Sequence, residues 1–156
     1  LIASKRVLIF GIQEIKEETV TVKECVPIRE NLFRTKEDSS LVLLGAKCAK
    51  CGQISFPKRE FCTKCLCEDQ EEVELSQEGE LHTFSILRVS DNHFNAPHPI
   101  GMINLPERVR VTAPLVYRED EQYAIGQKVR IVPDDLWEEE DRIVTGYRFE
   151  VVEDEK

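Results

Sequence analysis

Two Cys-x-x-Cys pairs dictate the local structure of one short segment of this chain. The pairs comprise Cys48 with Cys51 and Cys62 with Cys65, and ten residues separate them. A tetrahedral ion with metal–sulfur bonds of about 2.3 Å needs sulfur atoms about 3.8 Å apart, and two intervening residues let the chain turn tightly enough to supply them. The segment is too short to form an apolar core of its own, so it needs a cross-link to fold. We therefore predict one structural metal ion held by the four thiolates, with a short hairpin at 53–57 between the pairs.

Zinc is the ion that this pattern favours, in a rubredoxin-like zinc ribbon. Iron is the first alternative, because rubredoxins also bind their metal through two Cys-x-x-Cys turns. Disulfides or free thiols are the third, although the cysteines of secreted frameworks are seldom spaced in such pairs. Gly52 after the first pair allows a positive φ that turns backbone N–H groups toward the sulfurs, and the second pair lacks this glycine.

The two remaining cysteines lie outside this pattern. Cys67 follows Cys65 by two residues, a spacing that fits the turn poorly, and we predict a spare thiol there. Cys25 is distant from both pairs, and we predict a small buried side chain. A zinc ion with four cysteine ligands has no open position for water, so no catalysis is expected at this site.

Residues 73–152 alternate between apolar and polar side chains, as half-buried strands do. Val109 and Val111 alternate with arginines, and odd-numbered residues from Ile143 to Val151 favour β structure. Turn signals at 78–79 and 133–135, among others, separate the candidate strands. About five strands in some 80 residues fit a small closed barrel such as an OB-fold. The predicted fold class is therefore mainly β, a zinc ribbon followed by an OB-fold barrel.

Three blocks organise the chain: 1–44, the zinc ribbon at 45–67 and the barrel domain at 68–156. The first block opens with a β-rich extension at 1–18. After Pro27, residues 28–38 fit a short helix with Ile28, Leu32 and Phe33 on one face. Such a helix would have too few apolar residues to be stable alone, so it needs a surface to lie against.

Charge is distributed unevenly around a net value of −9. Residues 45–67 carry five Lys or Arg and one Asp or Glu, whereas residues 73–152 carry eight basic and fifteen acidic residues. Nucleic-acid binding by a zinc ribbon and OB-fold is an alternative function, but it needs a cationic groove, which an acidic barrel does not provide. The longest apolar run near the start has six residues, against about 20 for a membrane span, so we expect a cytoplasmic protein.

The sequence contains no phosphate-binding glycine loop, no Gly-x-Ser-x-Gly motif and no His-Glu-x-x-His motif. His82, His93 and His98 have no recognisable catalytic partners nearby in the sequence. We therefore predict a protein that is not an enzyme by itself.

An ordered set of short motifs resembles a known family. The motifs are LGAKCAKCG at 44–52, ISFPKREFCTKC at 54–65, GELHTF at 79–84, FNAPHPIG at 94–101 and IGQKV at 125–129. They are similar to those of the zinc-ribbon/OB-fold proteins, long described as a domain of unknown function, that accompany thiolases and other acyl-CoA enzymes. The resemblance covers about residues 27–150.

This resemblance implies a non-catalytic auxiliary subunit in a hetero-oligomer with a thiolase-fold catalytic subunit. It implies that the helix bearing Ile28, Leu32 and Phe33 docks on the partner. By the same analogy, Lys58 and Arg59 would face the phosphates of coenzyme A or acyl-CoA. Phe94 and Pro97 would lie along the acyl path. An accessory subunit of an acyl-CoA hydratase or aldolase is the alternative within the same family.

Overall fold

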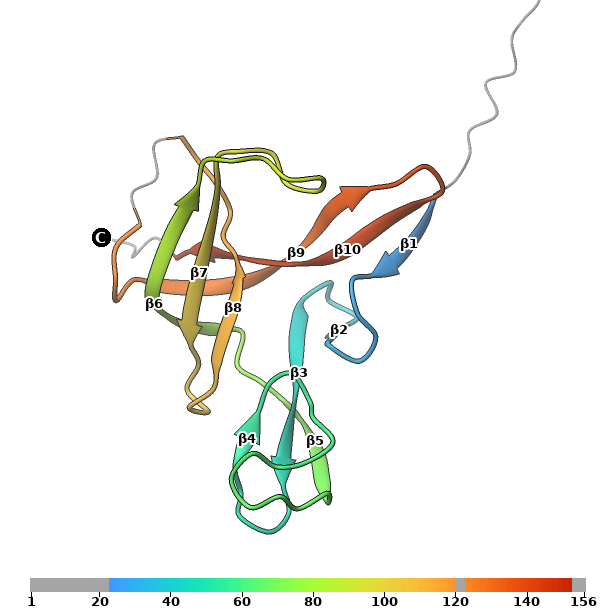
Figure 1. Cartoon of the computed structure of the whole chain (residues 1–156), viewed down its shortest axis with the longest axis vertical. Coiled ribbons are helices and arrows are strands. Elements are labelled where there is room, and N and C mark those ends of the chain that lie inside the picture. The colour runs from blue at the N-terminus through green and yellow to red at the C-terminus, as the bar shows by residue number, and fades with distance from the viewer. Residues whose placement is uncertain (1–22, 120–122, 153–156) are drawn as a thin grey trace, which may run out of the picture.

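The computed structural model describes residues 23–119 and 123–152, and ten strands and no helix occur in this part of the chain (Figure 1). Across those residues, nothing has the length and apolar character of a membrane-spanning helix. The strands are β1 Glu24–Pro27, β2 Phe33–Thr35, β3 Leu41–Cys48, β4 Ile54–Ser55, β5 Gln70–Glu74, β6 Glu78–Leu87, β7 His98–Asn104, β8 Arg110–Pro114, β9 Lys128–Glu138 and β10 Arg142–Val151. The mainly β prediction is confirmed, with the ribbon preceding the barrel.

The larger sheet curls into the predicted OB-fold barrel. Its strand order is β1-β10-β9-β6-β7-β8, and a parallel bridge between Leu115 and Phe149 joins the end of β8 to β10. The long β9–β10 hairpin continues beyond the barrel, where β1 pairs with β10 in parallel (Figure 1). Phe149 and Leu81 are fully buried in the barrel core. The three alternating segments fall in or beside β8, β9 and β10, and the five strands β6 to β10 match the predicted number.

Two of the predicted turns lie inside strands. Gly79 is in β6, where a Cβ would lie 2.6 Å from Ile103 Cγ2 and 2.7 Å from the Asn104 carbonyl oxygen. The glycine therefore serves close strand packing rather than a turn. Pro133 lies in β9, which pairs with β6 only as far as Arg130. The N–H that proline lacks is not needed on this free edge.

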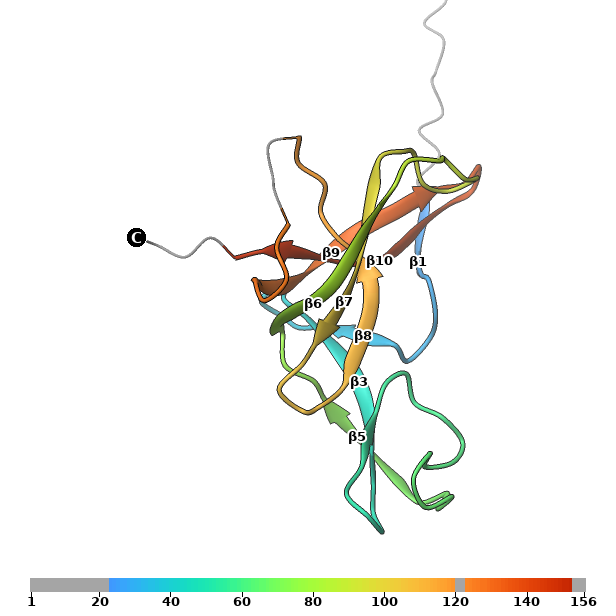
Figure 2. The same cartoon turned by 60° about the vertical axis from the view of Figure 1, so that its left-hand side comes forward.

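The smaller sheet is built around β3. This strand pairs with β2, β4 and β5, and its residues are buried except for Lys47. Its first half contributes Leu41 and Leu43 to the barrel core, and its second half carries Cys48 into the ribbon. Figures 1 and 2 show β3 running from the barrel into the ribbon, which projects from one end of the molecule. One strand therefore belongs to both units.

The predicted helix at 28–38 is wrong. The Ile28 N–H donates to the Thr145 carbonyl of β10, and the Leu32 carbonyl accepts from the Leu44 N–H of β3. Asn31 has a φ of 55°, which ends any helical turn. Phe33 lies in β2, with its ring 6.1 Å from that of Tyr147. Leu32 and Phe33 pack against the barrel core instead, whereas Ile28 is 44% exposed.

Two other N-terminal predictions have different outcomes. The β-rich extension at 1–18 lies outside the described residues. Cys25 was expected to be buried, but it is exposed in β1, because β1 lies at the edge of the sheet.

Hydrogen bonds fix the connection between ribbon and barrel. Glu107, in the turn between β7 and β8, accepts from the Ser76 backbone N–H at 2.8 Å and from its hydroxyl at 2.7 Å. Gln77 Nε2 donates to the Leu41 carbonyl at 3.0 Å. The linker between β5 and β6 is thereby held to both the barrel and β3.

Candidate metal centre and its surroundings

The structure brings the four predicted cysteines together. Their sulfur atoms all lie within 4.8 Å of one another, and both Cys48–Cys65 and Cys51–Cys62 are 3.5 Å apart. Cys48 and Cys62 are buried. The edge of a tetrahedron with metal–sulfur bonds of about 2.3 Å is about 3.8 Å. The donor set and its spacing therefore fit a four-coordinate zinc ion.

The two turns that carry the cysteines have the same backbone structure. Gly52 N–H donates to the Cys48 carbonyl and Leu66 N–H donates to the Cys62 carbonyl, both at 2.9 Å. Gly52 has a φ of 70° and Leu66 a φ of 57°. Leu66 thus occupies the left-handed position that glycine takes in the first turn, and its side chain is 76% exposed.

Backbone N–H groups favour ionised sulfur at part of this site. The pKa of Cys48 is lowered to about 6, chiefly by the Cys51 backbone N–H, although burial opposes this. For Cys65, the Cys67 backbone N–H lowers the pKa, but burial and the three neighbouring cysteines outweigh it and raise the pKa to about 12. Four adjacent thiolates therefore require a cation to coexist, and a divalent metal ion supplies that charge.

Leu66→Gly is expected to stabilise the metal-loaded chain by about 0.5–1 kcal/mol. The substitution removes a left-handed strain of about 1–2 kcal/mol, offset in part by the greater freedom of glycine in the unfolded chain. The matched change is Gly52→Ala. No atom lies within 4 Å of the added Cβ there, so only strain of about 1 kcal/mol is introduced. Thermal unfolding of both variants measures these opposite shifts, and a destabilised Leu66→Gly chain would contradict this account.

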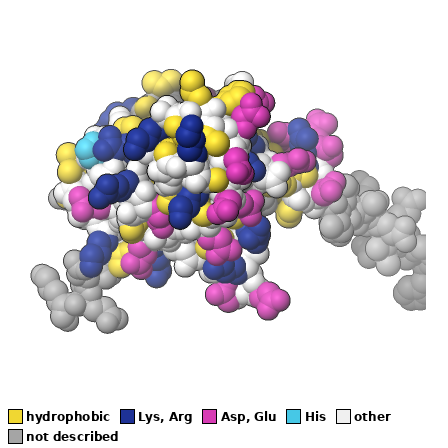
Figure 3. Space-filling model, turned by 90° about the horizontal axis from the view of Figure 1, so that it is seen from below, with side chains coloured by type: hydrophobic (Ala, Val, Ile, Leu, Met, Phe, Trp, Pro, Cys, Tyr) yellow, Lys and Arg dark blue, Asp and Glu magenta, His cyan; other side chains and the backbone are white. Residues whose placement is uncertain are grey.

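The segment that carries the cysteines also carries five basic side chains. None of the five forms a salt bridge with a described residue; they are Lys47, Lys50, Lys58, Arg59 and Lys64. Strand β5 lies beside β3 in the same sheet and adds acidic side chains, with Glu71 opposite Lys47. Figure 3, which views the molecule from the ribbon end, shows Lys and Arg interspersed with Asp and Glu. The sheet that carries the metal centre is therefore not uniformly basic.

A cavity of about 290 Å³ lies where the ribbon meets the barrel. Phe56 and Pro57 of the ribbon and Tyr147 of the barrel form part of its wall, together with Arg29 and Arg110. Lys58 and Arg59 follow Pro57 directly in the chain. Arg29 forms no salt bridge with a described residue. The structure thus places an aromatic and basic cavity next to the two predicted cationic residues.

Phe94 and Pro97 lie elsewhere, in the loop between β6 and β7. The loop and the ribbon are at opposite ends of the molecule (Figures 1 and 2). The Phe94 ring contacts Trp137 and His98, and the Arg148 guanidinium lies 5.8 Å from its centroid. The two predicted groups of coenzyme-facing residues therefore lie at opposite ends of the described part of the chain.

The conformation of this loop is set by Asp91. Its carboxylate accepts from the backbone N–H groups of Phe94 and His93 at 2.7 and 2.8 Å, and these bonds lower the pKa of Asp91. The His93 ring lies 4.4 Å from that of Trp137. The loop is therefore folded back onto the β9–β10 hairpin.

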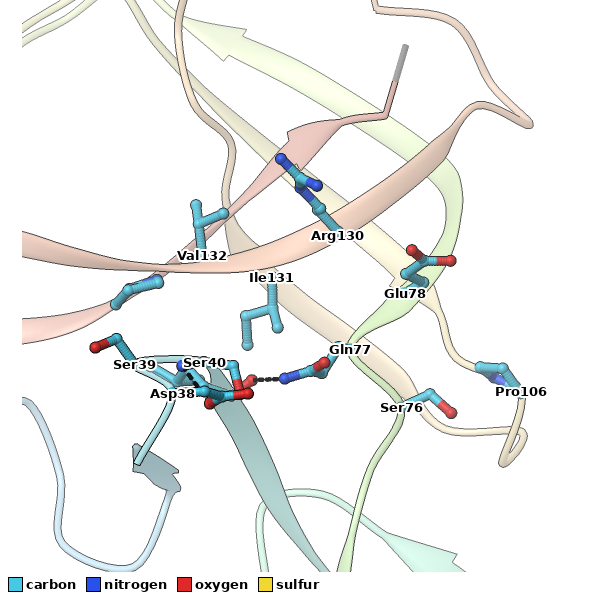
Figure 4. A pocket seen from close by; sticks show the side chains of 12 residues that line it. Asp38, Ser39, Ser40, Ser76, Gln77, Glu78, Pro106, Arg130, Ile131 and Val132 are labelled. Atoms are coloured by element: carbon cyan, nitrogen blue, oxygen red, sulfur yellow. Dashed lines mark hydrogen bonds between the residues drawn. The ribbon is translucent and has the colours of Figure 1, made fainter. Parts of the chain in front are cut away.

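A larger open hollow of about 700 Å³ lies where the start of β3, the β5–β6 linker and β9 meet (Figure 4). Asp38, Glu78 and Arg130 are its charged residues, and Arg130 is paired with Glu150 at 2.7 Å. The side chains spread along the hollow instead of converging (Figure 4). No predicted site residue lines it.

Two family models match consecutive parts of the chain. Residues 39–68 match the ChsH2 rubredoxin-like zinc ribbon domain, and residues 72–134 match the ChsH2 C-terminal OB-fold domain. A DUF35 domain-containing scaffold protein of Methanocaldococcus jannaschii is 36% identical over 116 residues, which cover 71% of this chain and 82% of that protein. The chain belongs to the DUF35 family. This confirms the resemblance predicted from the sequence. The match to the zinc ribbon model also confirms that residues 39–68 of this DUF35 chain form a zinc ribbon.

Further relatives carry more specific names. The benzoylsuccinyl-CoA thiolase subunit BbsA of Geobacter metallireducens is 33% identical to this DUF35 chain over 118 residues, covering 70% of the chain and 80% of BbsA. A solved structure named Ltp2-ChsH2(DUF35) aldolase superposes with a TM-score of 0.60 at 21% identity, covering 70% of this chain and 84% of that one. At that identity, the superposition shows a shared fold.

Two features of the site escaped the sequence analysis. Aligning the second cysteine pair on the first would have placed Leu66 at the position of Gly52. Arg29 carried no such signal, because only the folding of 28–32 onto β10 and β3 brings it to the cavity beside the ribbon.

Proposed function

We propose that this chain is a non-catalytic, zinc-binding subunit that assembles with the catalytic subunit of a thiolase-type acyl-CoA enzyme. The similarity to BbsA over 80% of that subunit carries the proposal. The metal centre agrees with it, since four cysteine ligands leave a bound zinc ion no open position for substrate. Cys48, Cys51, Cys62 and Cys65 would hold the ion, and its role would be to keep the ribbon folded.

An aldolase partner is the second candidate. The solved structure that shares the fold of this chain is named as an aldolase. Both candidates assign the chain the same role, that of a partner to a separate catalytic subunit, and they differ in the reaction of that subunit.

Co-expression with the proteins encoded nearby tests the assignment. Size-exclusion chromatography should show a stable hetero-oligomer with an acyl-CoA enzyme. Assays of thiolytic cleavage and of retro-aldol cleavage on the purified complex then separate the two candidates. A chain that forms no such complex but binds oligonucleotides in a salt-sensitive manner would instead establish the nucleic-acid alternative.

We further propose that Lys58 and Arg59 of the ribbon, together with Arg29, contribute to the coenzyme A site of the complex. Lys58, Arg59 and Arg29 support this, because they lack ion pairs with described residues and adjoin a cavity with aromatic walls. Phosphate groups are bound most readily by such unpaired cations. Phe94 and Pro97, at the other end of the molecule, would reach the acyl path only through the partner subunit.

The double variant Lys58→Glu with Arg59→Glu is expected to raise the KM of the complex for acyl-CoA about tenfold or more. A loss of about 1.4 kcal/mol in binding corresponds to tenfold in affinity, and the effect should shrink at high salt. The matched control reverses Arg108 and Lys128, barrel-domain residues that also lack ion pairs with described residues. Equal KM values for the two double variants would argue against a coenzyme contact at the ribbon.

A further inference from the structure

The outer face of β6, β7 and β8 carries no charged side chain over three successive rungs. Met102 is exposed while its neighbours Gly101 and Ile103 are buried, so alternate residues of β7 point outward. Residues opposite one another in register share that direction. The rungs are Leu87 with His98, then Ser85, Ile100 and Pro114, then Thr83, Met102 and Thr112. The register of β6 is irregular between Leu81 and Thr83, so the exposed His82 lies next to the third rung. In a chain with 33% charged residues, this face is unusual.

The next rung ends the uncharged face with two opposite charges. Glu80 of β6 and Arg110 of β8 lie on either side of Asn104 in the central strand β7. Arg110 Nε donates to Asn104 Oδ1 at 2.8 Å, so the guanidinium is turned toward β7. Neither Glu80 nor Arg110 forms a salt bridge with another described residue. The two charges are therefore placed symmetrically about the central strand and lack ion partners within the described chain.

We propose that this face binds a second copy of the same chain, about a two-fold axis that runs along β7. Such a rotation lays β6 of one copy over β8 of the other, with the two sheets face to face. Glu80 of each copy then lies opposite Arg110 of the other. Ile100 and Met102 lie next to the axis, against their own counterparts.

Charge complementarity favours a second copy over an unrelated protein as the occupant. A two-fold axis along β7 exchanges the positions of β6 and β8. It therefore brings Glu80 of one copy opposite Arg110 of the other only if both residues lie beside the same residue of β7. They do, since both are paired with Asn104. The three uncharged rungs would be buried without removing any charged group from water, which is the costly part of forming an interface. The surface contains none of the four cysteines, but Arg110 and Thr112 also line the cavity beside the ribbon, so the interface would border that cavity.

Charge reversal and its reciprocal rescue test the dimer. Sedimentation velocity on the zinc-loaded full chain, without any partner, should show a reversible monomer–dimer equilibrium over a range of micromolar concentrations. Glu80→Arg alone and Arg110→Glu alone should each raise the dimer dissociation constant about tenfold or more, because like charges then face each other. The double variant should return it to within about threefold of the unmodified chain.

Met102→Glu supplies an independent disruption, since it places two carboxylates beside the axis, and it should yield monomers. Circular dichroism and zinc content show whether the Met102→Glu chain is still folded. If it is not, Thr83→Glu, in the same rung as Met102, takes its place. A monomeric unmodified chain at the highest concentration would overturn the proposal. So would a double variant that associates as weakly as the single ones. Neither result bears on binding to a catalytic subunit, which the co-expression experiment measures separately.

Discussion

Cys51→Ser is expected to abolish metal binding and unfold the ribbon. Structural zinc sites of this kind have apparent binding free energies of about 10–16 kcal/mol, which equals or exceeds the total stability of about 5–15 kcal/mol of an ordinary domain. The ribbon has few buried apolar residues beyond its cysteines, so nothing replaces that contribution. Metal analysis should give one zinc per chain before the change and little after it. Binding to the catalytic subunit should be lost together with the metal.

Hydrogen exchange locates the damage from this change. Amides of β4 and of the two cysteine turns should lose protection, while those of β9 and β10 retain most of it. Cys67→Ser is the matched control, because the Cys67 sulfur lies outside the four-cysteine cluster and is 3.9 Å from the Asp69 carbonyl oxygen. Full metal content in Cys51→Ser would refute the assignment of the ligands. A folded complex that had lost only its turnover would show that the metal does more than support the fold.

Phe149→Ala is expected to lower the free energy of unfolding by about 3–5 kcal/mol. The side chain is fully buried, and the residue also forms the bridge to Leu115 that closes the barrel. Removing a buried ring forfeits its transfer free energy and leaves a cavity that the surrounding strands fill only in part. A loss of this size is comparable with the whole stability of a marginal domain, so the variant should unfold at clearly lower denaturant concentration.

Val89→Ala provides the comparison, because the Val89 side chain is 81% exposed and its truncation should change stability by less than about 0.5 kcal/mol. Urea titration of both variants measures the difference. A Phe149→Ala chain as stable as Val89→Ala would mean that the barrel core is not centred where the structure places it.

The metal centre and the barrel were predictable because both depend on short-range patterns. Two residues between cysteines specify the turn that presents two sulfurs, whatever the rest of the chain does. The alternation around Val129 and Val111 likewise follows from the two-residue repeat of a strand with one buried face.

The helix at 28–38 failed because its pattern is weak and its tertiary contacts are strong. Ile28, Leu32 and Phe33 fall on one helical face, yet the backbone of this segment bonds to β10 and β3 instead. The turn predicted at 133–135 failed for a similar reason. A proline is excluded from a strand only where the strand pairs on both sides, and β9 no longer pairs with β6 at Pro133. Neither outcome follows from local residue preferences.

The surroundings of the metal centre were only partly predictable. The basic composition of the ribbon was visible in the sequence, but the acidic strand β5 beside it was not assigned to the same sheet. That Lys58 and Phe94 lie at opposite ends of the molecule also depends on how the strands are arranged in space, which the sequence does not specify. Sequence order alone gave no indication that the loop at 88–97 folds onto Trp137.

The sharing of β3 between the ribbon and the barrel restricts how these proteins can be recombined. A chimera that exchanged residues 45–67 would replace the cysteine hairpin but leave β5 to pair with foreign residues in four of its five pairs with β3. It would also separate Leu41 and Leu43 from the cysteine end of their own strand. A functional exchange should therefore begin before Leu41 and end after Gln77, so that the metal-binding loop is inherited together with the part of the barrel core that supports it.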